Sequence, residues 1–95
     1  MTTRFDAAVE SDVEGLLAEL REAAEPGALH VAALRSLSDL ARNGEPDTAM
    51  DELGHVVESF TIPLSRSQYD TIEELATRLG EPEIPEDHGL RRFVF

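Results

Sequence analysis

The chain has 95 residues, which is enough for one small domain with a single hydrophobic core. Its 20 acidic and 8 basic residues give a formal net charge of −12, which disfavours direct binding to nucleic-acid phosphates. There is no cysteine, which excludes disulfides and thiolate metal sites, and no apolar run approaches the roughly 18 residues of a membrane span.

The first predicted helix covers residues 3–25. Thr3 is its expected N-cap, and Pro26 ends it because proline cannot continue a helix. A second interpretation stays open, in which Ser11 and Glu14 form a capping box of their own and the helix breaks near Ser11. The apolar residues that recur every three or four positions are Phe5, Val9, Val13, Leu16, Leu20 and Ala24.

The second predicted helix covers residues 28–42. Asn43 and Gly44 follow it and favour the left-handed backbone conformation that commonly ends a helix. The residues expected on its inner face are Leu29, Ala33, Leu37, Leu40 and Ala41.

The third predicted helix covers residues 45–60. Pro46 lies in its first turn, where the missing N–H of proline does no harm. Its apolar face consists of Ala49, Met50, Leu53, Val56, Val57 and Phe60.

The opposite side of this helix carries an acidic stripe, which we define as Asp47, Asp51 and Glu58. No basic residue occurs between Asn43 and Pro63, so the stripe has no local counter-charge. Asp47 and Asp51 repel each other across one turn, and a glycine inside a helix costs up to about 1 kcal/mol.

These local costs indicate a binding use for the stripe, with a solvated helix back as the alternative. Gly54 lies within the stripe and would let another backbone or side chain approach closely. Helix–helix contact inside the bundle is the other interpretation of Gly54, and its projected outward position counts against that.

The fourth predicted helix covers residues 65–79. Ser65 and Gln68 form a Ser-x-x-Gln capping box, and Leu64 and Tyr69 occupy the positions of a hydrophobic staple. The inner face consists of Tyr69, Ile72, Leu75, Ala76 and Leu79.

Residues 81–95 form a tail of different character. Two prolines interrupt regular structure at its start, whereas Leu90 and the final Phe93-Val94-Phe95 are too apolar for a solvated tail. We expect the tail to dock on the helices or to form a short extended edge, and a partner-binding hook is less favoured. The predicted fold is therefore all-α: one domain, 1–95, with four largely antiparallel helices and an irregular docked tail.

The sequence shows little enzyme chemistry. It contains neither a glycine-rich phosphate loop nor a nucleophile elbow, and its carboxylate pairs occupy helix positions predicted to face solvent. His30, His55 and His88 lie on three different elements, and none of them has a second ligand at i+3 or i+4 in a zinc-type motif, so we expect exposed or partly buried neutral histidines. We therefore expect no catalytic residues, no cofactor and no metal site.

One further pattern spans the third and fourth predicted helices. It comprises a Gly44-Glu45-Pro46 start, the acidic-apolar run Asp51-Glu52-Leu53, an Ile62-Pro63-Leu64 connection, and a helix with Tyr69 and Glu73-Glu74. This pattern resembles the MafI-type immunity proteins of bacterial polymorphic toxin systems. Such proteins are small, acidic and helical, and they bind a cognate secreted toxin, often a nuclease. The resemblance implies no catalytic residues, because inhibition needs only a surface.

Acidity and this resemblance together predict an immunity protein that neutralises a cognate, basic, nuclease-type toxin by electrostatic and steric blocking. The alternative is an acidic helical interaction module, such as an adaptor or antitoxin-like regulator, with no toxin partner. We expect a cytoplasmic monomer or weak homodimer without nucleic-acid or membrane partners. The residues expected to contact the partner are Asp47, Asp51, Glu52, Gly54, Glu58, Asp70 and Glu74.

Overall fold

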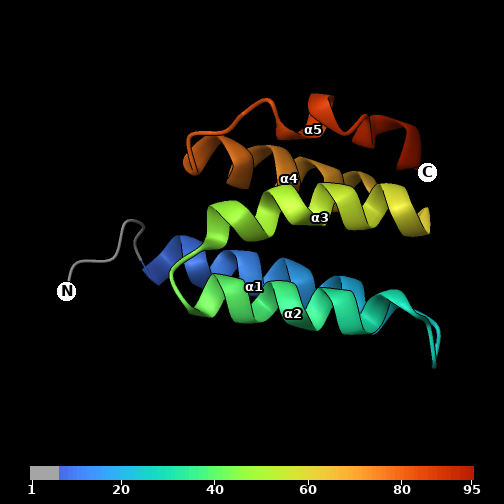
Figure 1. Cartoon of the computed structure of the whole chain (residues 1–95). Coiled ribbons are helices and arrows are strands. Elements are labelled where there is room, and N and C mark those ends of the chain that lie inside the picture. Colours follow the sequence, from blue (N-terminus) through green and yellow to red (C-terminus); the bar gives the residue numbers. More distant parts are fainter. Residues whose placement is uncertain (1–6) are drawn as a thin grey trace.

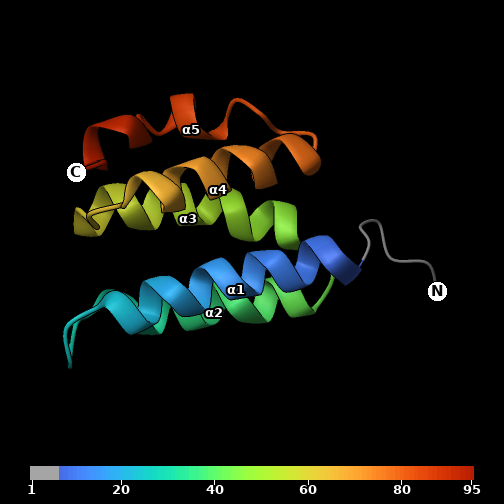
Figure 2. The same cartoon turned by 180° about the vertical axis from the view of Figure 1, so that it is seen from behind.

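Four longer helices and a short C-terminal segment make up residues 7–95, the part of the chain that this computed structural model describes (Figure 1). Consecutive helices run in opposite directions, with α1 and α2 in one layer and α3 and α4 in the other (Figures 1 and 2). The all-helical prediction is confirmed, and no helix among these residues has the length and apolarity needed to cross a membrane. The elements are α1 (Ala7–Ala23), α2 (His30–Arg42), α3 (Pro46–Phe60), α4 (Arg66–Arg78), α5 (Ile84–Asp87) and the 3-10 helix η1 (Leu90–Phe93).

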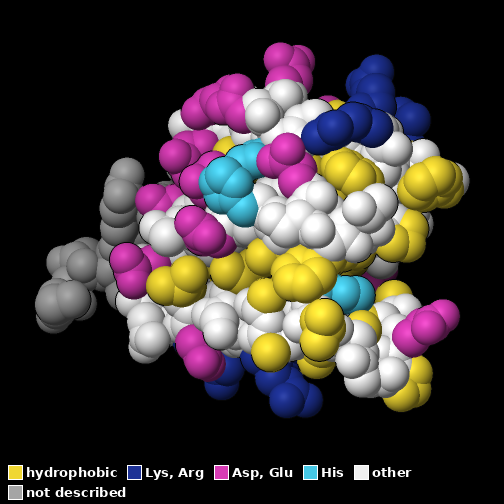
Figure 3. Space-filling model, turned by 45° about the vertical axis from the view of Figure 1, so that its right-hand side comes forward, with side chains coloured by type: hydrophobic (Ala, Val, Ile, Leu, Met, Phe, Trp, Pro, Cys, Tyr) yellow, Lys and Arg dark blue, Asp and Glu magenta, His cyan; other side chains and the backbone are white. Residues whose placement is uncertain are grey.

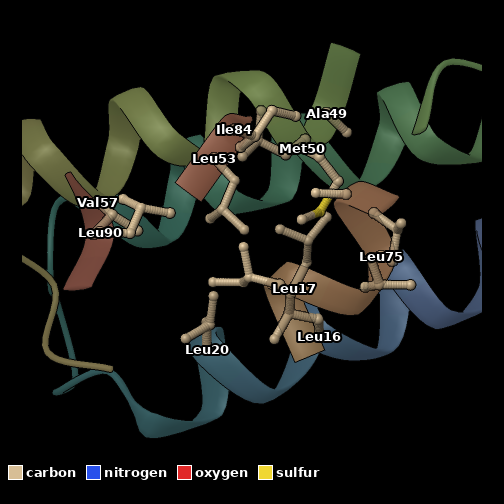
Figure 4. Close-up of a cluster of buried hydrophobic side chains, with 14 of the residues drawn as sticks. Leu16, Leu17, Leu20, Ala49, Met50, Leu53, Val57, Leu75, Ile84 and Leu90 are labelled. Carbon is tan, nitrogen blue, oxygen red and sulfur yellow. The ribbon is translucent and has the colours of Figure 1, made fainter. Parts of the chain in front are cut away.

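The core lies where the two layers meet. Leu17 of α1 and Leu53 of α3 are completely buried there, and Leu75 of α4 is buried beside them (Figure 4). The C-terminal segment adds Ile84 and Leu90 to the same cluster. Burying each such side chain stabilises the fold by about 1.5–3 kcal/mol, so the C-terminal segment is an integral part of the folded unit.

Helix α1 runs without interruption through Ser11, and the alternative break near that residue is therefore wrong. The helix ends at Ala23, two residues before the predicted end. The expected cap at Thr3 and the apolar residue Phe5 lie outside the described residues.

Helix α2 begins at His30, and its inner face differs from the prediction. Leu29 is 82% exposed because it precedes the first turn of the helix. Leu34 and Ser38 are buried instead, and together with Leu37 and Ala41 they follow the i, i+3, i+4, i+7 pattern of one helix face. The buried hydroxyl of Ser38 accepts a hydrogen bond from Arg21 Nη1 of α1 at 2.7 Å, which satisfies it.

Helix α3 closely follows its predicted range, but Phe60 at its end is 42% exposed and is not a core residue. The next residue, Thr61, has a left-handed backbone (φ 52°) and ends the helix there. The ring of Phe60 lies against that of His30, with centroids 5.9 Å apart.

The predicted capping box of α4 is confirmed. Ser65 Oγ accepts from the Gln68 backbone N–H at 3.0 Å, and Gln68 Oε1 accepts from the Ser65 N–H at 2.8 Å. Gln68 Nε2 also donates to Glu19 Oε1 of α1 at 3.2 Å, which joins the two layers at this point.

The C-terminal segment docks on α3 and α4, as expected, but much of it is regular. Pro85 lies in the first turn of α5, where no backbone N–H is needed. The last residues also form a short extended contact, because the Leu64 N–H donates to the Phe93 carbonyl (2.8 Å) and the Phe95 N–H donates to the Leu64 carbonyl (3.1 Å). This docking places His88, the residue that ends α5, on the outer side of α3.

Candidate functional site

His88 is the centre of a polar cluster on α3, although it lies far from that helix in the sequence. It is only 6% exposed. Its Nδ1 lies 2.7 Å from Glu58 Oε1, and its Nε2 lies 3.1 Å from Asp51 Oδ1. His55 completes the group, with its ring edge-on to that of His88 and the centroids 4.5 Å apart. We call Asp51, His55, Glu58 and His88 the His88 cluster.

Arg92 of η1 fastens the cluster from the other side. Its Nη2 donates to Glu58 Oε2 at 3.3 Å and to the His88 carbonyl at 3.2 Å. Glu58 therefore receives one donor on each oxygen, and both donors come from the C-terminal segment. The carboxylate holds this segment against α3.

Gly54 provides the space for the imidazole. A Cβ built on Gly54 would overlap the His88 ring, lying 2.7 Å from Nε2 and closer still to two ring carbons. The expectation that Gly54 admits a close side chain is confirmed, and that side chain belongs to the same chain. Its projected outward position was misleading, because Gly54 is buried beneath the C-terminal segment.

Opposing influences act on the protonation of His88. Burial is the largest single influence and lowers its pKa, but hydrogen bonds to Asp51 and Glu58 and the charges of both carboxylates together outweigh it. The pKa is consequently raised above the ordinary value of 6.5.

The structure places the predicted contact residues in three settings. Asp51 and Glu58 face His88, so the acidic stripe is not unopposed, and Gly54 lies between them. Glu52 is exposed and has no ion pair within residues 7–95, whereas Asp47 is half-buried and does interact. The two acids of α4 form ion pairs one turn away on their own helix: Asp70 with Arg66 (3.3 Å) and Glu74 with Arg78 (3.6 Å).

The sequence interpretation missed a helical pair of residues that could hold a metal ion. Asp51 precedes His55 by four residues, which places both side chains on one side of α3. Ligand atoms of Asp51, His55 and His88 all lie within 4.8 Å of one another. The prediction that no histidine has a second ligand in a zinc-type motif did not extend to this spacing, so it overlooked a pair of residues able to hold a cation. The contribution of His88 could not be read from spacing at all, because folding alone brings it to α3.

An acidic face surrounds the cluster. α5 packs against α3, and both helices carry exposed carboxylates. In Figure 3 Asp and Glu side chains gather around a histidine, while the visible arginines lie to the upper right and along the bottom. We define the acidic face as Glu52 of α3 together with Glu83, Glu86 and Asp87 of the C-terminal segment, all of which are exposed and have no ion pair within the described range.

The residues of the cluster and the acidic face have distinct chemical capacities. The cluster offers two imidazoles and a carboxylate to a cation, and the face offers fixed negative charge to a basic surface. Comparisons of this chain with protein-family models, with curated proteins and with solved structures each find no match.

Proposed function

We propose that this chain is an immunity protein that neutralises a basic toxin domain through its acidic face. The observation that carries the proposal is the placement of four exposed carboxylates, unpaired within residues 7–95: Glu52 on α3, Glu86 and Asp87 on the adjoining α5, and Glu83 directly before α5. A toxin that cleaves nucleic acid must present cations to phosphates, and those cations suit such a face. The resemblance of residues 44–76 to MafI-type proteins supports the toxin as partner.

The His88 cluster acts in this proposal as the support of the acidic face. Asp51 and Glu58 hold the C-terminal segment, and through it they fix α5 and the carboxylates of Glu83 and Glu86 relative to Glu52. A face held in advance loses less conformational entropy on binding than a mobile one. The two inner carboxylates therefore contribute indirectly, and the outer ones make the contacts.

Charge reversal tests the interface. The variant Glu52→Lys/Glu83→Lys/Glu86→Lys changes three exposed side chains whose loss breaks no ion pair within the described residues. The proposal requires a toxin gene beside the gene of this chain. When the variant is produced with that toxin, we expect it to lose the growth rescue that we expect of the wild type. We also expect association with the purified toxin to slow by about 10–100-fold at low salt, with little change in Tm.

The matched control changes the same total charge elsewhere. Glu22 and Glu25 lie on and next to the end of α1, are exposed and likewise form no ion pair within the described residues. Their double lysine variant, compared with the double variant Glu52→Lys/Glu83→Lys, should still rescue growth. Equal loss in both variants would show that net charge matters and the acidic face does not.

Suppression of toxicity by the wild type distinguishes the immunity function from the alternative, an interaction module without a toxin partner. If the wild type fails to suppress the neighbouring toxin, the immunity function is excluded. A basic protein that still binds the acidic face, and releases it upon charge reversal, would then identify an interaction module such as an adaptor.

A further inference from the structure

We propose that Asp51, His55 and His88 bind a divalent transition-metal ion of the zinc class, which joins the C-terminal segment to α3. The three residues offer two imidazole nitrogens and one carboxylate oxygen within 4.8 Å of one another. Zinc prefers this donor set, and three protein ligands leave a fourth position for water or a partner's side chain. This site is independent of the proposed toxin partner.

The hydrogen bonding of His88 supports a cation at this point. Both ring nitrogens face carboxylate oxygens, at 2.7 Å and 3.1 Å, yet a neutral imidazole has only one N–H to donate. The shorter contact assigns that N–H to Nδ1 and Glu58. The lone pair of Nε2 then points toward Asp51, and a positive charge is needed between these two groups. Either a second proton or a metal ion supplies it.

Glu58 has the position of an outer partner in such a site. A histidine that ligates a metal through one nitrogen usually donates its other N–H to a carboxylate, which fixes the tautomer and ring orientation. Glu58 accepts from Nδ1 in this way and is itself anchored by Arg92 at 3.3 Å. Nε2 of His88 is thus directed toward Asp51, with a ligand atom of His55 within 4.8 Å.

The geometry needs only a small adjustment to coordinate zinc. Bonds of about 2.0–2.2 Å in a tetrahedral site place ligand atoms about 3.3–3.6 Å apart. His88 Nε2 and Asp51 Oδ1, at 3.1 Å, are close to this separation and need to move only slightly apart. The remaining movement falls to His55, whose exposed ring can rotate without disturbing the core. The neighbouring acids Glu86 and Asp87 raise the local concentration of cations.

Proton and metal ion can be distinguished by titrating the untagged, chelator-treated full chain with Zn²⁺ in a calorimeter, and with Co²⁺ in an absorption spectrometer. We expect one tight site per chain and Co²⁺ absorption typical of a four-coordinate ion. His55→Ala is the principal variant, because its exposed side chain is not needed for folding, and it should weaken binding by at least about 100-fold. Glu58→Gln should weaken it by about 10–100-fold.

His30→Ala is the matched control, since His30 lies at the start of α2 against Phe60 and outside the cluster. It should bind Zn²⁺ as the wild type does, and excess Ca²⁺ should not compete with Zn²⁺ in either protein. Weak binding of several ions, displaced by Ca²⁺ and unaffected by His55→Ala, would overturn the proposal and show only attraction to surface carboxylates. Absence of Zn²⁺ binding would overturn it as well and leave a proton as the sole bridge.

Discussion

Replacing Gly54 by alanine is the sharpest test of how the C-terminal segment docks. In an ordinary helix the change stabilises, because alanine is better suited to a helix interior than glycine by about 1 kcal/mol. Here the three atoms nearest to a new Cβ all belong to the His88 ring, and the ring would have to move. Since His88 is held by carboxylates on both nitrogens, movement also loosens those hydrogen bonds.

The expected magnitude follows from these opposing effects. Overpacking of this kind costs about 1–3 kcal/mol, and weakening a partly exposed hydrogen bond to a charged group costs about 1 kcal/mol more. Subtracting the gain in helix propensity leaves Gly54→Ala destabilised by about 1–3 kcal/mol. In a domain of this size each kcal/mol corresponds to about 4–8 °C in Tm, so a fall of about 10 °C is expected.

Thermal and denaturant unfolding measure the loss of stability in Gly54→Ala, and two further variants show whether His88 is its cause. Gly15 on α1 is exposed with no atom near its Cβ position, so Gly15→Ala should raise stability by about 0.5–1 kcal/mol. In a His88→Ala background the penalty of Gly54→Ala should shrink by at least about 1 kcal/mol. If the penalty is the same in both backgrounds, Gly54 does not serve to admit His88, and the reasoning fails.

Three other predictions concern separate elements. Ser65→Ala removes the capping box of α4 and should lower the free energy of unfolding by about 1 kcal/mol, measured with urea; the exposed Ser67→Ala is its control. Leu90→Ala leaves a cavity under η1 and should cost about 2–5 kcal/mol, with faster hydrogen exchange across residues 84–93; unchanged exchange there would contradict tight docking. In chelator-treated protein, Asp51 and Glu58 stabilise the protonated form of His88 and so raise its pKa above 6.5. The ionic contribution of His88 to the free energy of unfolding is therefore complete below about pH 6.5 and is lost as the pH rises through the raised pKa. The stability difference between wild type and His88→Ala should therefore shrink from mildly acidic to alkaline pH, and a difference that grows would refute the assignment.

Local sequence patterns determined the helices. Ser65 and Gln68 specify the start of α4 because a capping box uses only residues three apart, and the apolar spacing of α3 specifies which side of it enters the core. Short-range physics is sufficient for such features, since hydrogen bonds and side-chain contacts within one or two turns decide them. Errors arose at helix ends, where Leu29 precedes the first turn of α2, Phe60 is the last residue of α3, and both remain exposed.

The tertiary structure alone decided what the acidic side of α3 does. Sequence identified Asp51, Gly54 and Glu58 as unusual, and each proves to contact His88, which lies on another element. The burial of His88 and its contacts with the two carboxylates depend on where the C-terminal segment docks. That docking is set by apolar contacts distant in the sequence, such as those of Leu90. The sequence alone indicated that Gly54 and the clustered carboxylates destabilise α3 locally. The group that compensates for this cost, the imidazole of His88, reaches α3 only when the chain folds.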